Sequence, residues 1–328
     1  MNLGILCGGN SSERAVSFES TLNVYNAVKK SYNPVLIDAG RGEVFTDIKK
    51  QEEKPSLGWD INLVQKILSI LNEKNIDFII VMLHGNYGED GHVQALLDMC
   101  NIPYTGSNMG ASYLGMNKEI SKYLMEYFKI PTPEAVFIDK DYDLMNIKNS
   151  LELPVIVKPI SEGSTIGISI VQDEKNLENA IEKGFKYGSK LIIEKYIDGE
   201  EMTLTVMDNK TYPVVKIIPS TGFYDYERKY GDGQSKYECP ADLSKKIKNK
   251  VNEDALLLYE KMDLSGAVRF DFLYNKETCK YYFLEVNTIP GMTEHSLVPM
   301  AFNAENINFK QLMDKIINNG FEKDKDEK

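Results

Sequence analysis

The sequence lacks several features that define common protein classes. It has four cysteines in 328 residues, Cys7, Cys100, Cys239 and Cys279, and no CxxC pair. Scattered cysteines of this kind indicate reduced, buried thiols in a cytoplasmic protein. No apolar run approaches the roughly 18 residues of a spanning helix, and the first residues show neither a basic region nor a small-residue cleavage site. We therefore expect a cytoplasmic protein without a membrane or secretion segment.

Basic side chains are also in the minority. The 38 Lys and Arg residues face 49 Asp and Glu residues, which gives a formal net charge of −11. No stripe of Lys and Arg alternates with aromatic residues, so we expect no nucleic-acid partner. An anionic small ligand would need a few local cations to hold it against this charge. The length and the 42% of hydrophobic residues predict a globular protein of two or three domains.

The amino-terminal part alternates strand and helix patterns and predicts an α/β unit. Leu3–Cys7 is an apolar strand, followed by a Gly-Gly turn at residues 8–13 and a helical pattern to about Lys29. The turn lacks the third glycine of the dinucleotide fingerprint GxGxxG. Taken alone, Glu13 is better explained as an acid favoured by the helix dipole than as a ligand-binding acid.

A second glycine-rich loop, residues 84–92, follows a strand predicted over Asp77–Leu83. Ligands of open α/β sheets collect at the carboxyl ends of strands, so His84 is placed to touch a substrate. A structural hydrogen bond is an equally good explanation of this histidine. The residues alone leave both roles open.

The middle of the chain predicts a strand, a flap and a second strand. The flap, Pro159–Gly167, contains glycines and hydroxyl side chains that are able to lie over phosphate oxygens, and Lys158 before it offers a cation. A further strand over Leu191–Ile197 precedes Glu201, which could accept hydrogen bonds from a ribose or could be an ordinary exposed acid. Residues 222–240 contain four tyrosines and no regular period, which favours a lid.

A β-hairpin is predicted around Thr278. Antiparallel pairing centred there sets Arg269 opposite Asn287 and Asp271 opposite Glu285. The two-residue period of a strand then places all four side chains on one face.

The other face of this hairpin is predicted to carry Tyr282, Leu284 and Val286. The two opposed carboxylates repel each other by about 3 kcal/mol at an effective dielectric near 20, so a cation should lie between them. Carboxylate and amide oxygens suit Mg²⁺. The alternative is that this hairpin face is solvated and its charged residues have no functional role. A Pro-Gly turn then brings Ser296 and Leu297 back beside the charged face.

Together these residues resemble the ATP-grasp enzymes, and within them the D-alanine:D-alanine ligase family, over nearly the whole chain. The signatures are GGNSSER, HGNYGEDG, VIVKPISEGSTIG, EKYIDGEE, GFYDYERKY, VRFDF and LEVNTIPGMTEHSL. The resemblance implies an α/β (α+β) ATP-grasp fold. It implies an N-terminal Rossmann-like pre-ATP-grasp domain (1–106), a central subdomain with the flap (107–198), a C-terminal subdomain with the lid and the metal hairpin (199–320), and a disordered tail (321–328).

The resemblance also implies roles for individual residues. ATP would be bound by Lys118, Lys158, Glu194, Lys195, Ile197, Glu201 and Lys229. Two Mg²⁺ ions, with Mn²⁺ as an alternative, would be held by Asp271, Glu285 and Asn287. The amino-acid substrates would be bound by Glu13, His84, Tyr224, Arg269, Gly291, Ser296 and Leu297. The catalytic set would be Glu13, Ser164, Tyr230, Arg269 and Ser296, in which Ser164 and Tyr230 link the flap to the lid.

The implied reaction is the ATP-dependent ligation of two D-alanines through an acyl phosphate, for peptidoglycan precursor synthesis, by a homodimer. Three alternatives stay open: D-lactate or D-serine as the second substrate, a nucleotide-binding module without catalysis, and a carboxylate-amine ligase for other substrates. Tyr230 favours the dipeptide. A module that had lost catalysis should have lost at least one of the residues Glu13, Arg269, Asp271, Glu285 and Ser296, which are all present.

Overall fold

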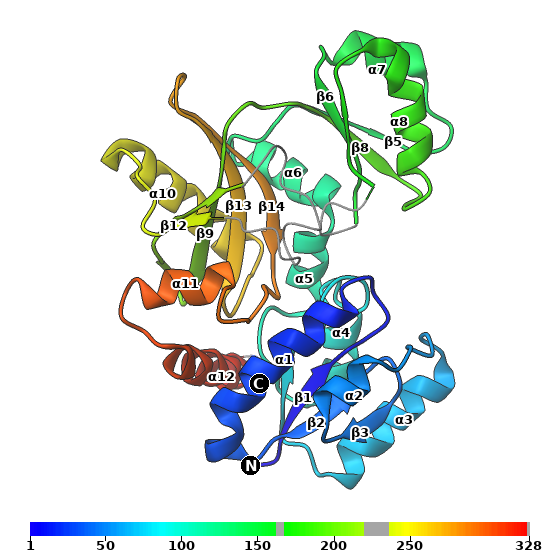
Figure 1. Ribbon diagram of the computed structural model, residues 1–328, viewed down its shortest axis with the longest axis vertical. Helices are drawn as coiled ribbons and strands as arrows, with labels where there is room; N and C mark the ends of the chain where they lie inside the picture. Colours follow the sequence, from blue (N-terminus) through cyan, green and yellow to red (C-terminus); the bar gives the residue numbers. More distant parts are fainter. Residues whose placement is uncertain (162–166, 220–235, 327–328) are drawn as a thin grey trace.

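The computed structural model describes residues 1–161, 167–219 and 236–326, and the described residues form three β-sheets (Figure 1). The first sheet lies at the lower end of Figure 1, near both ends of the chain, and the other two lie above it. The chain contains alternating β and α elements, which confirms the predicted mixed α/β fold.

The first sheet has the strand order β3-β2-β1-β4. Its strands are β1 (Leu3–Cys7), β2 (Val35–Asp38), β3 (Glu43–Phe45) and β4 (Phe78–Val81). β1 is parallel to β2 and β4, and all five of its residues are buried, as is usual for the apolar central strand of a parallel sheet. The helices around it are α1 (Arg14–Tyr32), α2 (Ile48–Glu52), α3 (Ile61–Glu73) and α4 (His92–Met99).

The second sheet is antiparallel and has the order β5-β8-β6-β7. Its strands are β5 (Ala135–Ile138), β6 (Val155–Pro159), β7 (Ser169–Val171) and β8 (Leu191–Lys195). The helices α7 (Leu144–Ser150) and α8 (Leu177–Gly184) and a short 3₁₀ turn (Glu174–Asn176) accompany it. Aliphatic side chains of these strands and helices form one core between them.

The third sheet has the order β12-β11-β9-β13-β14, with β10 paired to β9. Its strands are β9 (Glu200–Met207), β10 (Lys210–Thr211), β11 (Val215–Ile218), β12 (Lys236–Glu238), β13 (Val268–Asn275) and β14 (Lys280–Asn287). The remaining helices of the described residues are α5 (Met109–Met116), α6 (Lys118–Tyr127), α10 (Lys245–Lys261), α11 (Leu297–Asn303) and α12 (Phe309–Asp326).

The register of the β13–β14 hairpin is the one that the sequence predicts: Arg269 pairs with Asn287 and Asp271 pairs with Glu285. The prediction for the opposite face is wrong in part. A register shift after Asp271 leaves Leu284 as an extra residue, so the alternation of β14 changes there. The buried side chains of β14 are therefore Tyr281, Phe283 and Val286, whereas Tyr282 and Leu284 are half-buried.

Helix α12 extends to Asp326, although the sequence predicts a disordered tail from residue 321. The reason is packing: the ring of Phe321 lies 4.2 Å from that of Phe78 in β4, measured between centroids. The polar composition of the tail does not reveal that this one aromatic residue has a partner in the first sheet.

The four cysteines are free, as expected, but only Cys7 is buried. Cys100 and Cys239 are partly exposed. Cys279 is exposed because it lies in the hairpin turn with a φ of 52°. Within the described ranges, no helix has the length and apolar character needed to cross a membrane.

Candidate active site

A cleft lies where loops of the first sheet meet the hairpin of the third. The residues of the amino-terminal part that line it are Glu13, His84 and Glu89, and those of the hairpin are Arg269, Glu285, Val286 and Asn287. Lys118 and Gly291 line it as well. The cleft thus gathers predicted site residues from segments far apart in the sequence.

Glu13 reaches the cleft from the glycine turn before α1. Gly8 and Gly9 have φ values of 76° and 73°, which side chains with a Cβ rarely adopt, so glycine permits the tight turn. Glu13 is the N-cap residue of α1 but makes no side-chain capping hydrogen bond, and it is 7% exposed. Its Oε2 atom lies so close to Gly85 that a Cβ there would be 3.1 Å away. The carboxylate therefore faces the cleft and does not cap the helix.

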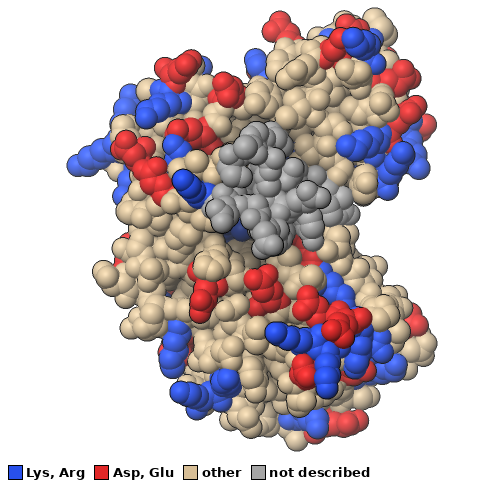
Figure 2. Space-filling view, viewed as in Figure 1, with Lys and Arg blue, Asp and Glu red and all other residues tan. Residues whose placement is uncertain are grey.

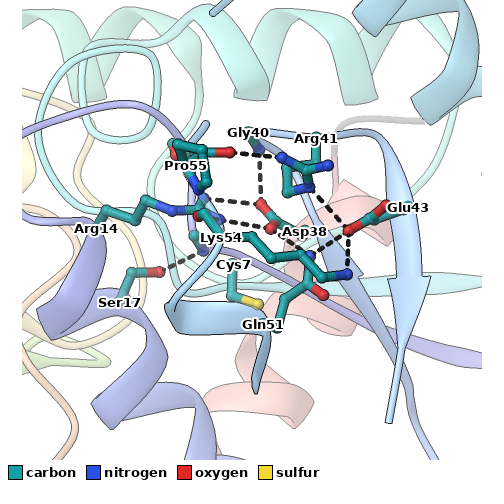
Figure 3. A network of polar contacts seen from close by, with 12 residues as sticks. Cys7, Arg14, Ser17, Asp38, Gly40, Arg41, Glu43, Gln51, Lys54 and Pro55 are labelled. Carbon is teal, nitrogen blue, oxygen red and sulfur yellow. Dashed lines mark hydrogen bonds and ion pairs between the residues drawn. The ribbon is translucent and has the colours of Figure 1, made fainter. Parts of the chain in front are cut away.

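A polar network behind the turn fixes its position (Figure 3). Arg14 donates through Nη1 (2.9 Å) and Nη2 (2.7 Å) to the two carboxylate oxygens of Asp38, and through Nη1 to the carbonyl of Gly9 (2.7 Å). Gln51 Nε2 donates to Asp38 (2.7 Å) and to Glu43 (2.6 Å). Burial opposes ionisation of Glu43, but hydrogen bonds from Gln51 and neighbouring cations lower its pKa to about 2. These bonds tie Arg14, the residue after Glu13, to Asp38 at the end of β2 and to Gly9 in the turn.

His84 joins α1 to the segment after the hairpin. Its Nδ1 lies 2.9 Å from the carbonyl oxygen of Ile289, and its Nε2 lies 3.4 Å from Ser20 Oγ. Burial lowers the pKa of His84, although the carboxylate of Glu13 opposes this effect. A neutral imidazole at the wall of the cleft is compatible with both roles that the sequence leaves open.

Glu89 is a site residue that the sequence reasoning missed. Its Oε2 accepts a hydrogen bond from Gly85 N (2.8 Å) and its Oε1 accepts one from Ile289 N (3.3 Å). Burial, and then the nearby charge of Glu13, raise the pKa of Glu89 to about 8. Its position five residues after His84 in the same glycine-rich loop is the signal that could have identified it.

The hairpin face combines acids with cations of the chain itself. Glu285 lines the cleft, whereas Asp271 lies outside its lining. Arg269 donates to Asp271 through Nε (2.7 Å) and Nη2 (2.8 Å), and Asn287 Nδ2 donates to Asp271 Oδ2 (3.1 Å). Lys118 Nζ lies 3.2 Å from Glu285 Oε2. Since Asp271 and Glu285 are paired across the hairpin, these two cations reduce the repulsion that the sequence predicts.

The donor set of the predicted metal site fits Mg²⁺ in its chemistry. Asp271, Glu285 and Asn287 present carboxylate and amide oxygens on one face, and Mg²⁺ is usually held by one or two carboxylates with its other positions open to water and phosphates. In the part of the chain that the structure covers, no three or more His, Cys, Asp or Glu side chains gather as metal ligands. The site has two such acids and an amide, so the protein alone would not enclose an ion.

Glu194 and Lys158 lie together on neighbouring strands of the second sheet. Lys158 Nζ donates to Glu194 Oε1 (2.5 Å), and Glu194 Oε2 lies 3.2 Å from Nζ of Lys122. The Glu194 carboxylate is 1% exposed and forms ion pairs with both lysines. Lys122, on α6, is a second charged residue that the sequence reasoning missed, because its local pattern does not indicate that it is buried.

The other predicted residues lie outside the lining of the cleft. Lys195 ends β8 and is exposed, Ile197 follows it, and Glu201 pairs with Leu273 in the third sheet. Ser296 precedes α11, and Leu297 is the first residue of that helix. The predicted residues that fall outside the described ranges are Ser164, Tyr224, Lys229 and Tyr230.

Comparisons with known proteins agree over the whole chain. The family models described as D-ala D-ala ligase N-terminus and D-ala D-ala ligase C-terminus match residues 2–107 and 105–318. A D-alanine–D-alanine ligase of Carboxydothermus hydrogenoformans is 37% identical, over 98% of this chain and 99% of its own.

Solved structures give the same result. The D-alanine–D-alanine ligase of Bacillus anthracis complexed with ATP is 34% identical, has a TM-score of 0.81, and is matched over 100% of this chain and 99% of its own. The VanG D-Ala:D-Ser ligase of Enterococcus faecalis is 26% identical, has a TM-score of 0.79, and is matched over 98% of this chain and 100% of its own.

The fold and the cleft define an ATP-grasp enzyme, in which Glu285 of the hairpin and Lys118 of α6 line the same cleft. The agreement of both family models and of the relatives makes the assignment more specific. The chain belongs to the D-alanine–D-alanine ligase family, which confirms the resemblance found in the sequence.

Proposed function

We propose that the cleft joins two D-alanines to D-alanyl-D-alanine at the expense of ATP, for peptidoglycan precursor synthesis. The observation that carries the proposal is the meeting of Glu13 and His84 with Arg269, Glu285 and Asn287 in one cleft. The first two come from loops at the carboxyl ends of parallel strands, where α/β sheets bind substrates. The last three come from the hairpin whose acids suit a metal-bound nucleotide.

Each side chain then has a task in the reaction. The buried carboxylate of Glu13 would receive the ammonium of the first D-alanine, whose carboxylate attacks the γ-phosphate of ATP and releases ADP. The amine of the second D-alanine attacks the carbonyl carbon of the acyl phosphate, and phosphate leaves. Arg269, beside the Gly291 backbone, would stabilise the developing oxyanion. Lys118 and Lys158 would hold the phosphates, since ammonium groups are strong donors to anionic oxygens.

Mg²⁺, held by Asp271, Glu285 and Asn287, would disperse negative charge on the transferred phosphoryl group. Arg269 donates to both carboxylate oxygens of Asp271, so binding a cation there requires the guanidinium to share or release that carboxylate. The released guanidinium would be available to the amino-acid substrates. The same residues would accept Mn²⁺, which also prefers oxygen ligands.

We further propose the domain boundaries that the sequence suggests, with the first domain ending at residue 106. The two family models meet at residues 105–107, which supports that boundary. Roles for Ser164 and Tyr230 in closing the site, and for Tyr224 and Lys229 in the lid, remain proposals from the resemblance. A homodimer and a cytoplasmic location are proposed as well. The free cysteines support a reducing compartment.

D-alanine is proposed as the second substrate as well as the first. The relatives that are 35–37% identical over nearly the whole chain are D-alanine–D-alanine ligases, which supports this choice. Fold similarity does not decide it, because the TM-scores of 0.81 and 0.79 are nearly equal.

Phosphate release tests the proposal. The protein with ATP and Mg²⁺ should release phosphate when D-alanine is added, and the dipeptide should form in equal amount. L-alanine, D-serine and D-lactate, each offered with and without D-alanine, form the comparison panel. Release that does not depend on D-alanine would contradict the proposed activity, and a mixed product with D-serine or D-lactate at equal rate would contradict the proposed second substrate.

A further inference from the structure

Lys122 lies in the interior of the protein, where an ammonium group is costly. Its residue exposure is 0%. Nζ donates to Thr132 Oγ1 (2.8 Å) and to the carbonyl of Pro133 (2.7 Å), and it lies 3.2 Å from Glu194 Oε2. Burial lowers the pKa of Lys122, and the carboxylate of Glu194 opposes that effect. Removing one partner of a buried ion pair leaves an uncompensated charge in the interior, so the burial of this lysine requires an explanation.

Glu194 is shared between two lysines. One carboxylate oxygen binds Lys158 Nζ at 2.5 Å, and the other faces Lys122 Nζ at 3.2 Å. Burial raises the pKa of Glu194, but the two ammonium groups outweigh burial and lower it. With both lysines charged and the acid ionised, the three groups have one positive charge in excess, which suits an incoming anion.

The surroundings of Lys122 hold it in place. The loop after α6 is tied to β14, because Thr132 Oγ1 donates to the carbonyl of Phe283 (2.9 Å) and Phe283 N donates to the carbonyl of Pro131 (2.8 Å). Lys122 is therefore fixed between β8 and the hairpin. Among the described residues, Lys158 Nζ donates a hydrogen bond to Glu194 Oε1.

Helix α6 presents cations to both sides of the site. Lys118 and Lys122 are four residues apart and are both buried, so they share one face of the helix. Lys118 reaches Glu285 in the third sheet, whereas Lys122 reaches Glu194 in the second. Figure 1 shows α6 between the hairpin and the strands of the second sheet.

We propose that Lys122 is a positioning residue for nucleotide binding, which keeps Glu194 paired while Lys158 transfers its ammonium from that carboxylate to the phosphates of ATP. The proposal rests on the proposed phosphate-binding role of Lys158. Without Lys122, the transfer would leave a buried carboxylate with no cation. The free-energy cost of the unpaired carboxylate would be the same in the enzyme–ATP complex and in the transition state. Its loss of pairing should therefore raise the KM for ATP and leave kcat unchanged.

The substitution Lys122→Gln tests the proposal, because it removes the charge and keeps a donor for the carbonyl of Pro133. The KM for ATP should rise at least about 10-fold, with kcat within about 3-fold of wild type and the KM for D-alanine unchanged. Lys122→Arg keeps the charge and should recover most of the affinity for ATP. A folded Lys122→Gln protein with the wild-type KM for ATP would overturn the proposal.

Lys190→Gln is the matched control. Its Nζ pairs with Glu119 on the same helix at 3.2 Å, but its side chain is 51% exposed. Surface pairs of this kind contribute little, so the KM for ATP should not change. A purely structural role of Lys122 would lower the melting temperature and leave the KM for ATP as it is, which thermal unfolding and kinetics together reveal.

A comparison within the Glu194→Gln background does not require the Lys122→Gln single variant to fold. The Glu194→Gln variant has no carboxylate whose charge Lys122 would have to balance. Adding Lys122→Gln to it should therefore change the KM for ATP by less than about 3-fold. A change above about 10-fold in that background would show that Lys122 acts otherwise and would refute the proposal. Calorimetric titration with ATP gives the same comparison without turnover, so a wild-type protein that failed to ligate D-alanine would still allow the test.

Discussion

Arg269 and Asp271 are two residues apart on β13 and point to the same side. The positive charge of Arg269 therefore compensates the negative charge of Asp271 on this face of the hairpin. Their two hydrogen bonds, at 2.7 Å and 2.8 Å, give the carboxylate a cation of the same strand. Glu285 obtains its cation from α6 through Lys118. The acids that are proposed to hold Mg²⁺ are therefore the same acids that hold the groups proposed to contact substrate and phosphate.

Replacing one of these acids should abolish ligation and preserve the fold. Asp271→Asn or Glu285→Gln removes a proposed metal ligand, and we expect dipeptide formation to fall by at least about 100-fold. Circular dichroism should remain that of the wild type. Glu277→Gln, in the exposed turn of the same hairpin, is the control and should keep full activity. Near-normal turnover in either site variant would refute the assignment.

Glu89 should make the stability of the protein depend on pH. Its pKa of about 8 in the folded protein lies above the ordinary value of 4.5, so between these values the folded state holds a proton that the unfolded chain has lost. The free energy of unfolding should therefore fall as the pH rises from 5 to 8. Glu89→Gln removes this dependence, and its stability relative to wild type should improve by at least ~1 kcal/mol over that range. Urea unfolding at several pH values measures both slopes, and parallel curves would contradict the prediction.

Helix α6 carries both Lys118 and Lys122 of the proposed nucleotide site. Asn117 starts it by accepting hydrogen bonds from Glu119 N (3.1 Å) and Ile120 N (3.2 Å), as is common for an asparagine at the start of a helix. The residue after this cap is Lys118. The cap therefore sets where the helix begins, and with it the positions of Lys118 and Lys122.

Removing the cap of α6 should affect nucleotide binding, whereas removing a comparable cap elsewhere should not. Asn117→Ala should cost about 1 kcal/mol of stability and raise the KM for ATP. Asp143 caps α7 in the same way, with hydrogen bonds from Met145 N (2.9 Å) and Asn146 N (3.3 Å). Asp143→Ala should lose about as much stability without a change in the KM for ATP. Equal kinetic effects in both variants would contradict this role of α6.

The elements themselves show what a sequence can and cannot predict. Alternation and a turn were enough to set Asp271 opposite Glu285, because the strand period and the turn position fix the register. The bulge at Leu284 could not be predicted, since an extra apolar residue in an apolar strand leaves no distinct pattern. Nor could the burial of Glu89 and Lys122, because their partners, Ile289 and Glu194, are remote in the sequence.

At the scale of the molecule, the last helix completes the first sheet. Buried residues of α12, among them Leu312 and Ile316, share a core with Leu3 of β1 and Phe78 of β4. Gly320 lies so close to Phe78 that a Cβ would be 2.8 Å from its ring, and Figure 1 shows α12 beside α1. On the face shown in Figure 2, basic and acidic side chains are intermixed around this region and above it.

Phe321→Ala should measure the contribution of this contact. Phe321 is partly buried against the first core, so its loss should cost about 2–3 kcal/mol, somewhat less than a fully buried phenylalanine. Glu322→Ala, at the neighbouring exposed position, should change stability by less than about 0.5 kcal/mol. Thermal and urea unfolding give both values. Equal stability of the two variants and the wild type would mean that the end of α12 contributes nothing.

The packing of α12 on β1 and β4 has a consequence for synthesis on the ribosome. The strands of the first sheet emerge early, yet part of their apolar surface is covered only by a helix that begins at Phe309. Until that helix has been translated, the nascent chain exposes apolar surface that chaperones would recognise. Premature termination before this point should therefore yield fragments that are degraded, even though they already contain Glu13 and the hairpin acids.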